Sequence, residues 1–332
     1  MRFPLLTSFA VILLLAASAC VFAQQHPPMT EQRRDAEKET YFAAFTELTR
    51  MPLPENKRKA YEAAIEYLKR FEGDRDADAR VVRAYVTEYE REGRQLELFK
   101  IYSAKNYVKT FELGRTMLEH DPQNFFVLAV LTEAGIDNAL AGDTSLNDTT
   151  VGYGKKAIQL LETGKLAKAD PFTDFEVARG YLNSAVGALL KDKTPVEAAQ
   201  AYRKAAQSNS FYKNDPIVYH RLGITILKGE FAQLSNEYNQ KFGSRQSSPE
   251  QQAMLQRIIK LAEQAIDAYA RAVALSDPAR AATSEPAPRP QFPPELRARL
   301  FEQLTALYKS FHNNSDSGLT ELIAGVLTKP MP

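Results

Sequence analysis

The spacing of apolar residues constrains the fold of this chain more than any other feature of its sequence. From residue 31 onward, apolar side chains recur at steps of three and four, the period of an amphipathic helix. Alanine, leucine, glutamate, lysine and arginine dominate these segments, and strand signals are scarce. The sequence therefore predicts an all-α fold. The expected helices cover residues 31–50, 55–71, 77–91 (continuing to 102 after a break near Gly93), 105–119, 124–140, 151–163, 172–190, 195–208, 216–228, 249–275, 294–312 and 319–327.

Two kinds of helix carry a recurring residue pattern. In the first kind, Tyr219 is followed three residues later by Leu222 and then by Gly223. In the second kind, alanine, tyrosine and alanine follow one another at steps of four and three. This second pattern occurs at Ala198, Tyr202 and Ala205, and again at Ala265, Tyr269 and Ala272. Asp-Pro pairs at 121–122 and 277–278 close two of the units.

These patterns resemble the two helices of the tetratricopeptide repeat, whose units recur about every 34 residues. The resemblance covers residues 31–278 and implies an α-solenoid of about five helical hairpins. It also implies that Tyr219 fills the core of its hairpin and that Gly223 lets two helices approach closely. The spacing departs from the family pattern, because Gly114 replaces an aromatic residue and insertions fall at about 142–150 and 229–248. A helical bundle built from αα-hairpins remains the alternative. We expect the second insertion to form a short helix packed on the array, or a lip over its groove.

Capping residues and prolines predict several helix boundaries. Thr194 precedes Pro195 and is expected to cap the helix that begins there, and Ser248 is expected to cap the next long helix. Residues 279–293 are rich in proline and form the predicted linker, either as a spacer or as a polyproline ligand. Residues 294–332 then form C-terminal helices, the first of which is expected to cap the last hairpin, or to dock on a partner.

The N-terminus has the layout of a secretory signal peptide. Arg2 precedes an apolar run at 5–19, which is short for a membrane span and is followed by small residues. Cleavage after Ala23 would leave residues 24–30 as a flexible lead. Alternatively, the run that ends in Cys20 resembles a bacterial lipobox, which makes this cysteine a lipidation site. A retained anchor helix is a third reading. We therefore expect an exported protein, periplasmic or attached to the envelope by a lipid.

Composition narrows the classes of partner and chemistry. Cys20 is the single cysteine, so the mature chain is expected to have no disulfide and no thiolate metal site. The 42 basic and 41 acidic side chains become equal in number once Arg2 is removed, which argues against nucleic-acid binding. Beyond the signal peptide, no stretch is long and apolar enough to be expected to span a membrane.

No catalytic, cofactor or metal motif is recognised in the sequence. The four histidines lack metal-ligand spacing, and the glycines at 152 and 154 lack the strand and spacing of a phosphate loop. Acidic pairs such as Glu88 and Glu90 are typical of solvated helix faces. We therefore expect a protein that is not an enzyme and needs no cofactor or metal.

The sequence favours a scaffold that binds a segment of a partner protein in the groove formed by the first helices of the hairpins. The residues expected to face that groove are Glu133, Ile136, Asp137, Asn183, Gly187, Lys191, His220, Ile224 and Lys228. Reversing the charges of Lys191 and Lys228 is expected to weaken partner binding. The alternatives are an envelope lipoprotein that binds a small ligand or glycan, with Tyr153, Tyr181 or Tyr238 in an aromatic pocket, an envelope assembly lipoprotein, and a helical enzyme.

Overall fold

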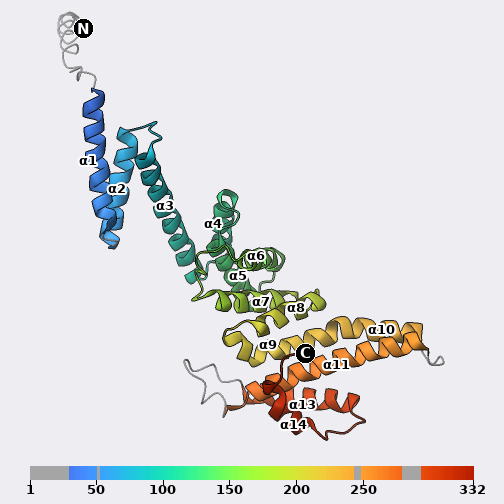
Figure 1. Ribbon diagram of the computed structural model, residues 1–332. Helices are drawn as coiled ribbons and strands as arrows, with labels where there is room; N and C mark the ends of the chain where they lie inside the picture. Colours follow the sequence, from blue (N-terminus) through green and yellow to red (C-terminus); the bar gives the residue numbers. More distant parts are fainter. Residues whose placement is uncertain (1–29, 51–52, 243–247, 279–292) are drawn as a thin grey trace, which may run out of the picture. The chain divides into compact units, whose positions relative to one another are not determined.

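The computed structural model describes residues 30–50, 53–242, 248–278 and 293–332, and within these ranges the chain is helical and has no strand (Figure 1). The predicted all-α fold is therefore confirmed. The chain divides into two compact units, residues 1–94 and 95–332, which are described separately below. The signal peptide, Cys20, the lead at 24–29 and most of the proline-rich linker lie outside the described residues.

The first unit is formed by α1 (Glu31–Arg50), α2 (Pro54–Arg70) and the first part of α3 (Ala77–Ser103). Aromatic and small side chains alternate in its core, so that large rings fill the space left where alanines let the helices approach. The buried apolar residues of this core are Phe45, Ala60, Ala64, Tyr67, Phe71, Ala79 and Val82.

The predicted break near Gly93 does not occur, and α3 continues without interruption to Ser103. A Cβ atom at Gly93 would meet nothing within 4 Å, so no packing contact needs a glycine there. A glycine in an exposed helix costs about 1 kcal/mol relative to alanine, and the helix formers on both sides of it offset that cost.

The second unit continues from the end of α3 as a succession of short helices. Their bounds are α4 (Tyr107–His120), α5 (Phe125–Leu140), α6 (Asn147–Glu162), α7 (Phe175–Leu190), α8 (Pro195–Gln207), η1 (Phe211–Asn214), α9 (Pro216–Ile226), η2 (Leu227–Phe231), α10 (Ala232–Lys241), α11 (Pro249–Leu275), α13 (Pro294–Phe311), α14 (Leu319–Gly325) and η3 (Val326–Thr328). From α4 to α9 each α-helix packs on the next in the chain, and α9 and α13 pack on α11 (Figure 1). This order of contacts is that of a solenoid-like stack of hairpins.

One close contact recurs in three hairpins of this unit. A Cβ atom on Gly187 of α7 would lie 3.1 Å from the Tyr202 ring of α8, and one on Gly223 of α9 would lie 3.0 Å from the Tyr269 ring of α11. On α5, a Cβ atom on Gly135 would lie 1.9 Å from the hydroxyl oxygen of Thr150 on α6. In each hairpin the glycine of the first helix therefore admits a side chain of the second, as the sequence predicted for Gly223.

The boundary predictions are partly confirmed. The Ser248 hydroxyl accepts a hydrogen bond from the Gln251 N–H and so caps α11. Thr194 precedes α8, but its side chain makes no capping hydrogen bond, and its hydroxyl instead lies 3.4 Å from Glu197 Oε2. The insertion at 229–248 contains the expected short helix, α10, which packs on α11.

The C-terminal helices pack against α11. Leu300, Leu304 and Tyr308 of α13 are buried in this contact. Arg271 of α11 pairs with Asp267 at 2.6 Å and donates to the backbone oxygens of residues 329 and 330. The end of the chain is thus fixed on the last long helix. Among the described helices none combines the length and hydropathy needed to cross a membrane.

Candidate binding site

Two acidic and three aromatic side chains from α3, α5, α7 and η1 lie together in the second unit. Glu133 and Asp137 lie four residues apart on α5 and so share one face of the helix. The Tyr102 hydroxyl, at the end of α3, donates a hydrogen bond of 2.9 Å to Asp137 Oδ2. Tyr181 comes from α7, which contacts α5, and Tyr212 comes from η1, which contacts α7. We call these five residues the acid–tyrosine cluster.

The tyrosines are held in place by ring contacts and by a glycine. The Tyr181 and Tyr212 rings meet edge to face, with centroids 6.4 Å apart, and Phe172 lies 5.3 Å from Tyr181. A Cβ atom on Gly180 would lie 2.5 Å from Tyr212, so a glycine at this position of α7 is what lets η1 pack closely. The local sequence thus fixes aromatic rings near the carboxylates.

Glu133 differs electrostatically from an ordinary surface glutamate. Burial raises its pKa to about 7, and the negative charge of Asp137 contributes to the rise. Among the described residues, no side chain or backbone group forms a hydrogen bond or ion pair with the Glu133 carboxylate. The carboxylate therefore has lost much of its hydration without gaining a partner inside the chain.

The surrounding phenols stay uncharged near neutral pH. Burial raises the pKa values of Tyr102, Tyr181 and Tyr212, and the charge of Glu133 raises them further. Neutral phenols combine an apolar face with a hydroxyl that donates or accepts hydrogen bonds. The cluster can therefore offer a cation both carboxylate oxygens and ring faces.

Of the residues that the sequence placed in the groove, three lie in this cluster or on the same helix. Asn183 and Gly187 are instead buried in contacts between or within helices. Glu133 and Asp137 belong to it, and Ile136 is half-buried on the same helix. Asn183 is 2% exposed, and its side-chain amide donates to the backbone oxygen of residue 179 on its own helix. Gly187 is buried against Tyr202. The assignment of Asn183 and Gly187 to an open groove is corrected, because both serve helix packing.

Lys191 and Lys228 form a separate charged group. Both ammonium groups pair with Asp192, Lys228 at a distance of 3.2 Å from Oδ1. Half or more of the side-chain surface of Lys228 and Asp192 is exposed, so these ion pairs are well solvated. The two lysines lie on the surface, and their charges are already partnered by Asp192.

The remaining predicted residues, His220 and Ile224 of α9, are half-buried. The His220 ring lies 5.8 Å from the Tyr269 ring, and burial lowers its pKa. Ile224 packs against the main core of the second unit. Neither residue presents a largely open side chain to a partner.

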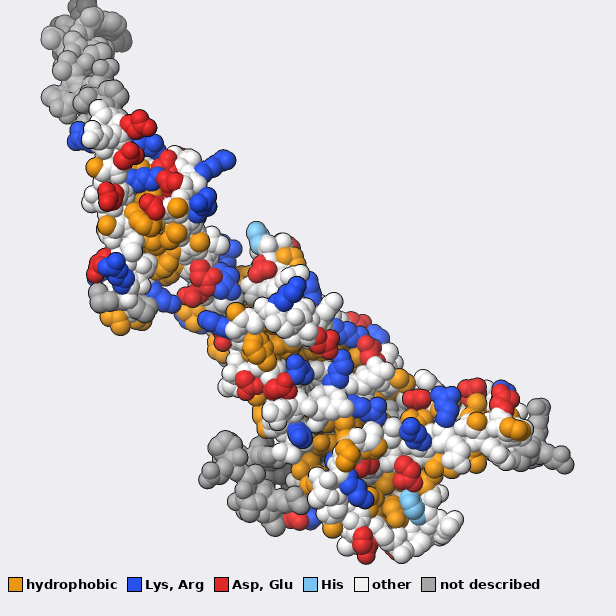
Figure 2. Space-filling view, viewed as in Figure 1, with side chains coloured by type: hydrophobic (Ala, Val, Ile, Leu, Met, Phe, Trp, Pro, Cys, Tyr) orange, Lys and Arg blue, Asp and Glu red, His pale blue; other side chains and the backbone are white. Residues whose placement is uncertain are grey.

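Tyr153 and Tyr238, the other two tyrosines proposed for an aromatic pocket, have contacts of their own. The Tyr153 ring contacts Phe111, and the Tyr238 hydroxyl accepts a hydrogen bond from Gln251, so neither joins Tyr181 in a common pocket. Within the described ranges no group of histidine, cysteine, aspartate and glutamate has the arrangement of a metal site. Basic and acidic side chains are interspersed on the face shown in Figure 2.

A small pocket of about 90 Å³ lies elsewhere in the second unit. It is lined by Val196, Ala199, Gln200, Arg203, Thr225, Ile226, Glu230, Leu261 and Gln264. Arg203 already donates to Gln264 Oε1 at 3.2 Å. The pocket shares no residue with the acid–tyrosine cluster.

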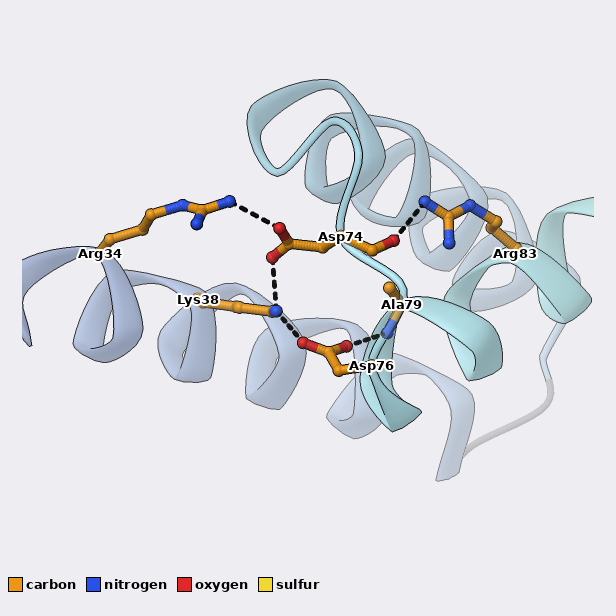
Figure 3. Close-up of polar contacts among 6 residues, drawn as sticks. All are labelled: Arg34, Lys38, Asp74, Asp76, Ala79 and Arg83. Carbon is orange, nitrogen blue, oxygen red and sulfur yellow. Dashed lines mark hydrogen bonds and ion pairs between the residues drawn. The ribbon is translucent and has the colours of Figure 1, made fainter. Parts of the chain in front are cut away.

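The first unit contains a cluster in which the carboxylates are paired with cationic side chains of the same chain. Asp74 accepts hydrogen bonds from Arg34 at 2.6 Å and from Lys38 at 2.5 Å, and Lys38 also pairs with Asp76 (Figure 3). The backbone oxygen of Asp74 accepts a bond of 2.6 Å from Arg83, and Asp76 Oδ1 accepts one of 2.9 Å from the N–H of Ala79 (Figure 3). We call these residues the Asp74 cluster. It joins α1 to the turn before α3 and to α3 itself.

The ionisation of the Asp74 cluster follows from its pairing. The hydrogen bond from Lys38 lowers the pKa of Asp74, and the backbone N–H of Ala79, followed by Lys38, lowers the pKa of Asp76. Desolvation acts to lower the pKa of Lys38, but its hydrogen bonds to the two carboxylates outweigh this and raise it. Each carboxylate is satisfied within the chain, so this cluster is structural.

Sequence reasoning did not identify Tyr102 or Tyr212 as parts of the candidate site. Tyr102 lies at the end of a helix whose length was uncertain from the sequence, and η1 was not predicted at all. Comparisons with protein-family models, curated proteins and solved structures gave no match to this chain.

Proposed function

We propose that this chain is a scaffold of the tetratricopeptide type that binds a segment of a partner protein on the first helices of its hairpins. The observation that carries the proposal is the acid–tyrosine cluster, in which the Glu133 carboxylate is desolvated and has no partner among the described residues. The cluster is assembled from residues of α3, α5, α7 and η1. A surface contributed by several hairpins suits an extended partner segment better than a single side chain.

The proposal is supported by the recurring glycine contacts as well. Gly187 and Gly223 each admit a tyrosine ring of the following helix, which is the role that the tetratricopeptide pattern gives to its small and aromatic residues. In such an array the first helices line one side of the stack. Glu133 and Asp137 lie on α5, which would be one of these first helices.

The test is site-specific photocrosslinking in the cells that make the protein. Benzoylphenylalanine replaces Tyr107, a half-buried aromatic residue at the start of α4 that packs against the same hydrophobic core as Tyr102. The matched control replaces Phe301 of α13, which is 46% exposed. We expect a protein adduct at Tyr107 and none at Phe301, with the adduct lost in Glu133→Gln. No adduct at Tyr107, or equal adducts at both positions, would contradict the proposal.

The alternative of a small ligand is favoured by the same aromatic rings, because phenol rings also bind sugars and organic cations. It predicts no protein adduct at Tyr107. It predicts instead that a free glycan or amine raises the melting temperature of the purified chain, and that Glu133→Gln abolishes the rise.

A further inference from the structure

We propose that the acid–tyrosine cluster receives a lysine or arginine side chain of the partner segment, and that apolar residues flank this basic residue in the segment. The inference rests on the proposed function, because it names the chemistry of the segment that the scaffold would bind.

Charge complementarity is the first argument for a cation. Glu133 and Asp137 place two carboxylates on one face of α5, and only Asp137 receives a donor, the Tyr102 hydroxyl. A neutral segment that covered Glu133 would remove its remaining water without replacing it. A guanidinium or ammonium group would supply charge-assisted hydrogen bonds to the same oxygens.

The described part of the chain does not supply that cation to Glu133. Two other partly buried carboxylates are paired internally, Asp267 with Arg271 at 2.6 Å and Asp74 with Arg34 and Lys38. No lysine or arginine is among the groups that shift the pKa of Glu133. Within the described residues, the carboxylate at the centre of the cluster is thus left for a cation from outside.

Exposed apolar side chains border the cluster on two sides. Phe99, which is 40% exposed, lies with its ring 6.0 Å from Tyr102, and Leu140, 77% exposed, lies one turn beyond Asp137 on α5. On the side of η1, Phe211 is 53% exposed and its ring lies 4.2 Å from Tyr212. Burying such side chains under apolar residues contributes about 25 cal/mol for each Å² removed from water. The partner segment is therefore expected to combine one basic residue with apolar neighbours.

The sign of the pH dependence separates a basic segment from a neutral one. Among the described residues, the charged group that shifts the pKa of Glu133 is Asp137 on its own helix, while Tyr102, Tyr181 and Tyr212 stay neutral near pH 7. Because Glu133 titrates near 7, a basic segment binds more tightly as the pH rises from about 6 to about 8, by up to about tenfold. A neutral segment prefers the protonated form of Glu133, so its binding weakens as the pH rises over the same range.

The experiment is a selection of random displayed peptides against the purified full chain. Parallel selections use Glu133→Gln, which keeps the shape of the side chain, and Glu112→Gln on the exposed face of α4, which changes the net charge equally. Peptides enriched by the unchanged chain are then measured by fluorescence anisotropy. In each peptide the basic residue is compared with a neutral isostere of the same shape, citrulline for arginine or N-acetyl-lysine for lysine.

We expect peptides with a lysine or arginine between apolar residues from the unchanged chain and from Glu112→Gln, but not from Glu133→Gln. The neutral isostere should weaken binding by about tenfold or more. Enriched peptides without a basic residue, or basic peptides that bind Glu133→Gln equally well, would overturn the inference and leave the proposed function intact. No enrichment at all would overturn both. A melting-temperature rise with free arginine in that last case would assign the cluster to a small cation instead.

Discussion

The Asp74 cluster of the first unit and the acid–tyrosine cluster of the second treat partly buried carboxylates in opposite ways. Asp74 is 16% exposed and accepts hydrogen bonds from two cationic side chains, whereas Glu133 has no partner among the described residues. Pairing lowers the pKa of Asp74, and burial raises that of Glu133. The Asp74 charge is satisfied within the fold, and under the proposed function the unpaired Glu133 charge marks the surface that receives the partner.

The two clusters also predict opposite effects of pH on stability. Asp74 has a lowered folded-state pKa, so its contribution is present above its ordinary value of 3.8 and is lost as the pH falls through the lowered value. Glu133 has a raised folded-state pKa, so folding loses stability as the pH rises from 4.5 to about 7. Single substitutions in the two clusters, and in the helices that carry them, test this difference.

The largest effect is expected from Gly135→Ala, which breaks the packing that positions Glu133 on α5. The new methyl group would meet Thr150 at 1.9 Å from its hydroxyl oxygen, so α5 and α6 must separate. We expect the free energy of unfolding to fall by about 1–3 kcal/mol after the gain in helix propensity is subtracted. Gly152→Ala on α6, where a Cβ would meet nothing within 4 Å, is the control and should stabilise by about 0.5–1 kcal/mol. Urea denaturation measures both, and equal effects would contradict the packing account.

Asp74→Asn tests the paired cluster. Removing the charge weakens the bonds from Arg34 and Lys38, which should cost about 2 kcal/mol at neutral pH. Hydrogen exchange of peptides from α1 should report this loss in the full chain. The cost should shrink as the pH falls below 3.8, because the native carboxylate is then being protonated as well. A cost that stays constant down to low pH would show that Asp74 acts through shape alone.

Glu133→Gln tests the unpaired acid and should have the opposite sign. At about pH 8 the charged carboxylate lacks part of its hydration, so the neutral amide should raise the free energy of unfolding by about 1–2 kcal/mol. Near pH 4.5 the native side chain is already protonated, and the gain should largely vanish. Glu112→Gln should be neutral at both pH values. If Glu133→Gln destabilised the chain at pH 8, a hidden cationic partner would be indicated.

Reversing Lys191 and Lys228 to glutamate should have the smallest effect on folding. Their pairs with Asp192 are solvated, so we expect less than about 1 kcal/mol of destabilisation by thermal denaturation. The same variant tests whether the partner segment continues along the first helices, as the sequence predicted. A fall in affinity for the selected peptides would place the two lysines in the site, and an unchanged affinity would remove them from it.

The sequence predicted the helices well because their apolar faces repeat at the helical period over long segments. It also predicted the role of Gly223, since an aromatic residue and a leucine precede the glycine at fixed steps. Asn183 and Gly187 were misplaced because a one-dimensional pattern shows which helix a residue belongs to more clearly than which face it turns to a neighbour.

The candidate site could be only partly predicted. Glu133 and Asp137 were identified from their positions on a first helix, but whether a carboxylate finds a cation depends on side chains that are distant in sequence. Tyr102 reaches Asp137 across 35 residues, and Tyr212 is placed by a short 3₁₀ turn that carries little sequence signal. Local patterns carry no information about such contacts.

The most direct test of the central claim is the ionisation of Glu133 itself, measured by carboxyl-carbon NMR on the full chain labelled with ¹³C-glutamate. The signal is assigned by its loss in Glu133→Gln. The account predicts a titration midpoint close to 7, which moves lower when a selected basic peptide is bound. A midpoint near the ordinary value of 4.5 in the free chain would show that Glu133 is well hydrated or already paired, and would contradict the account.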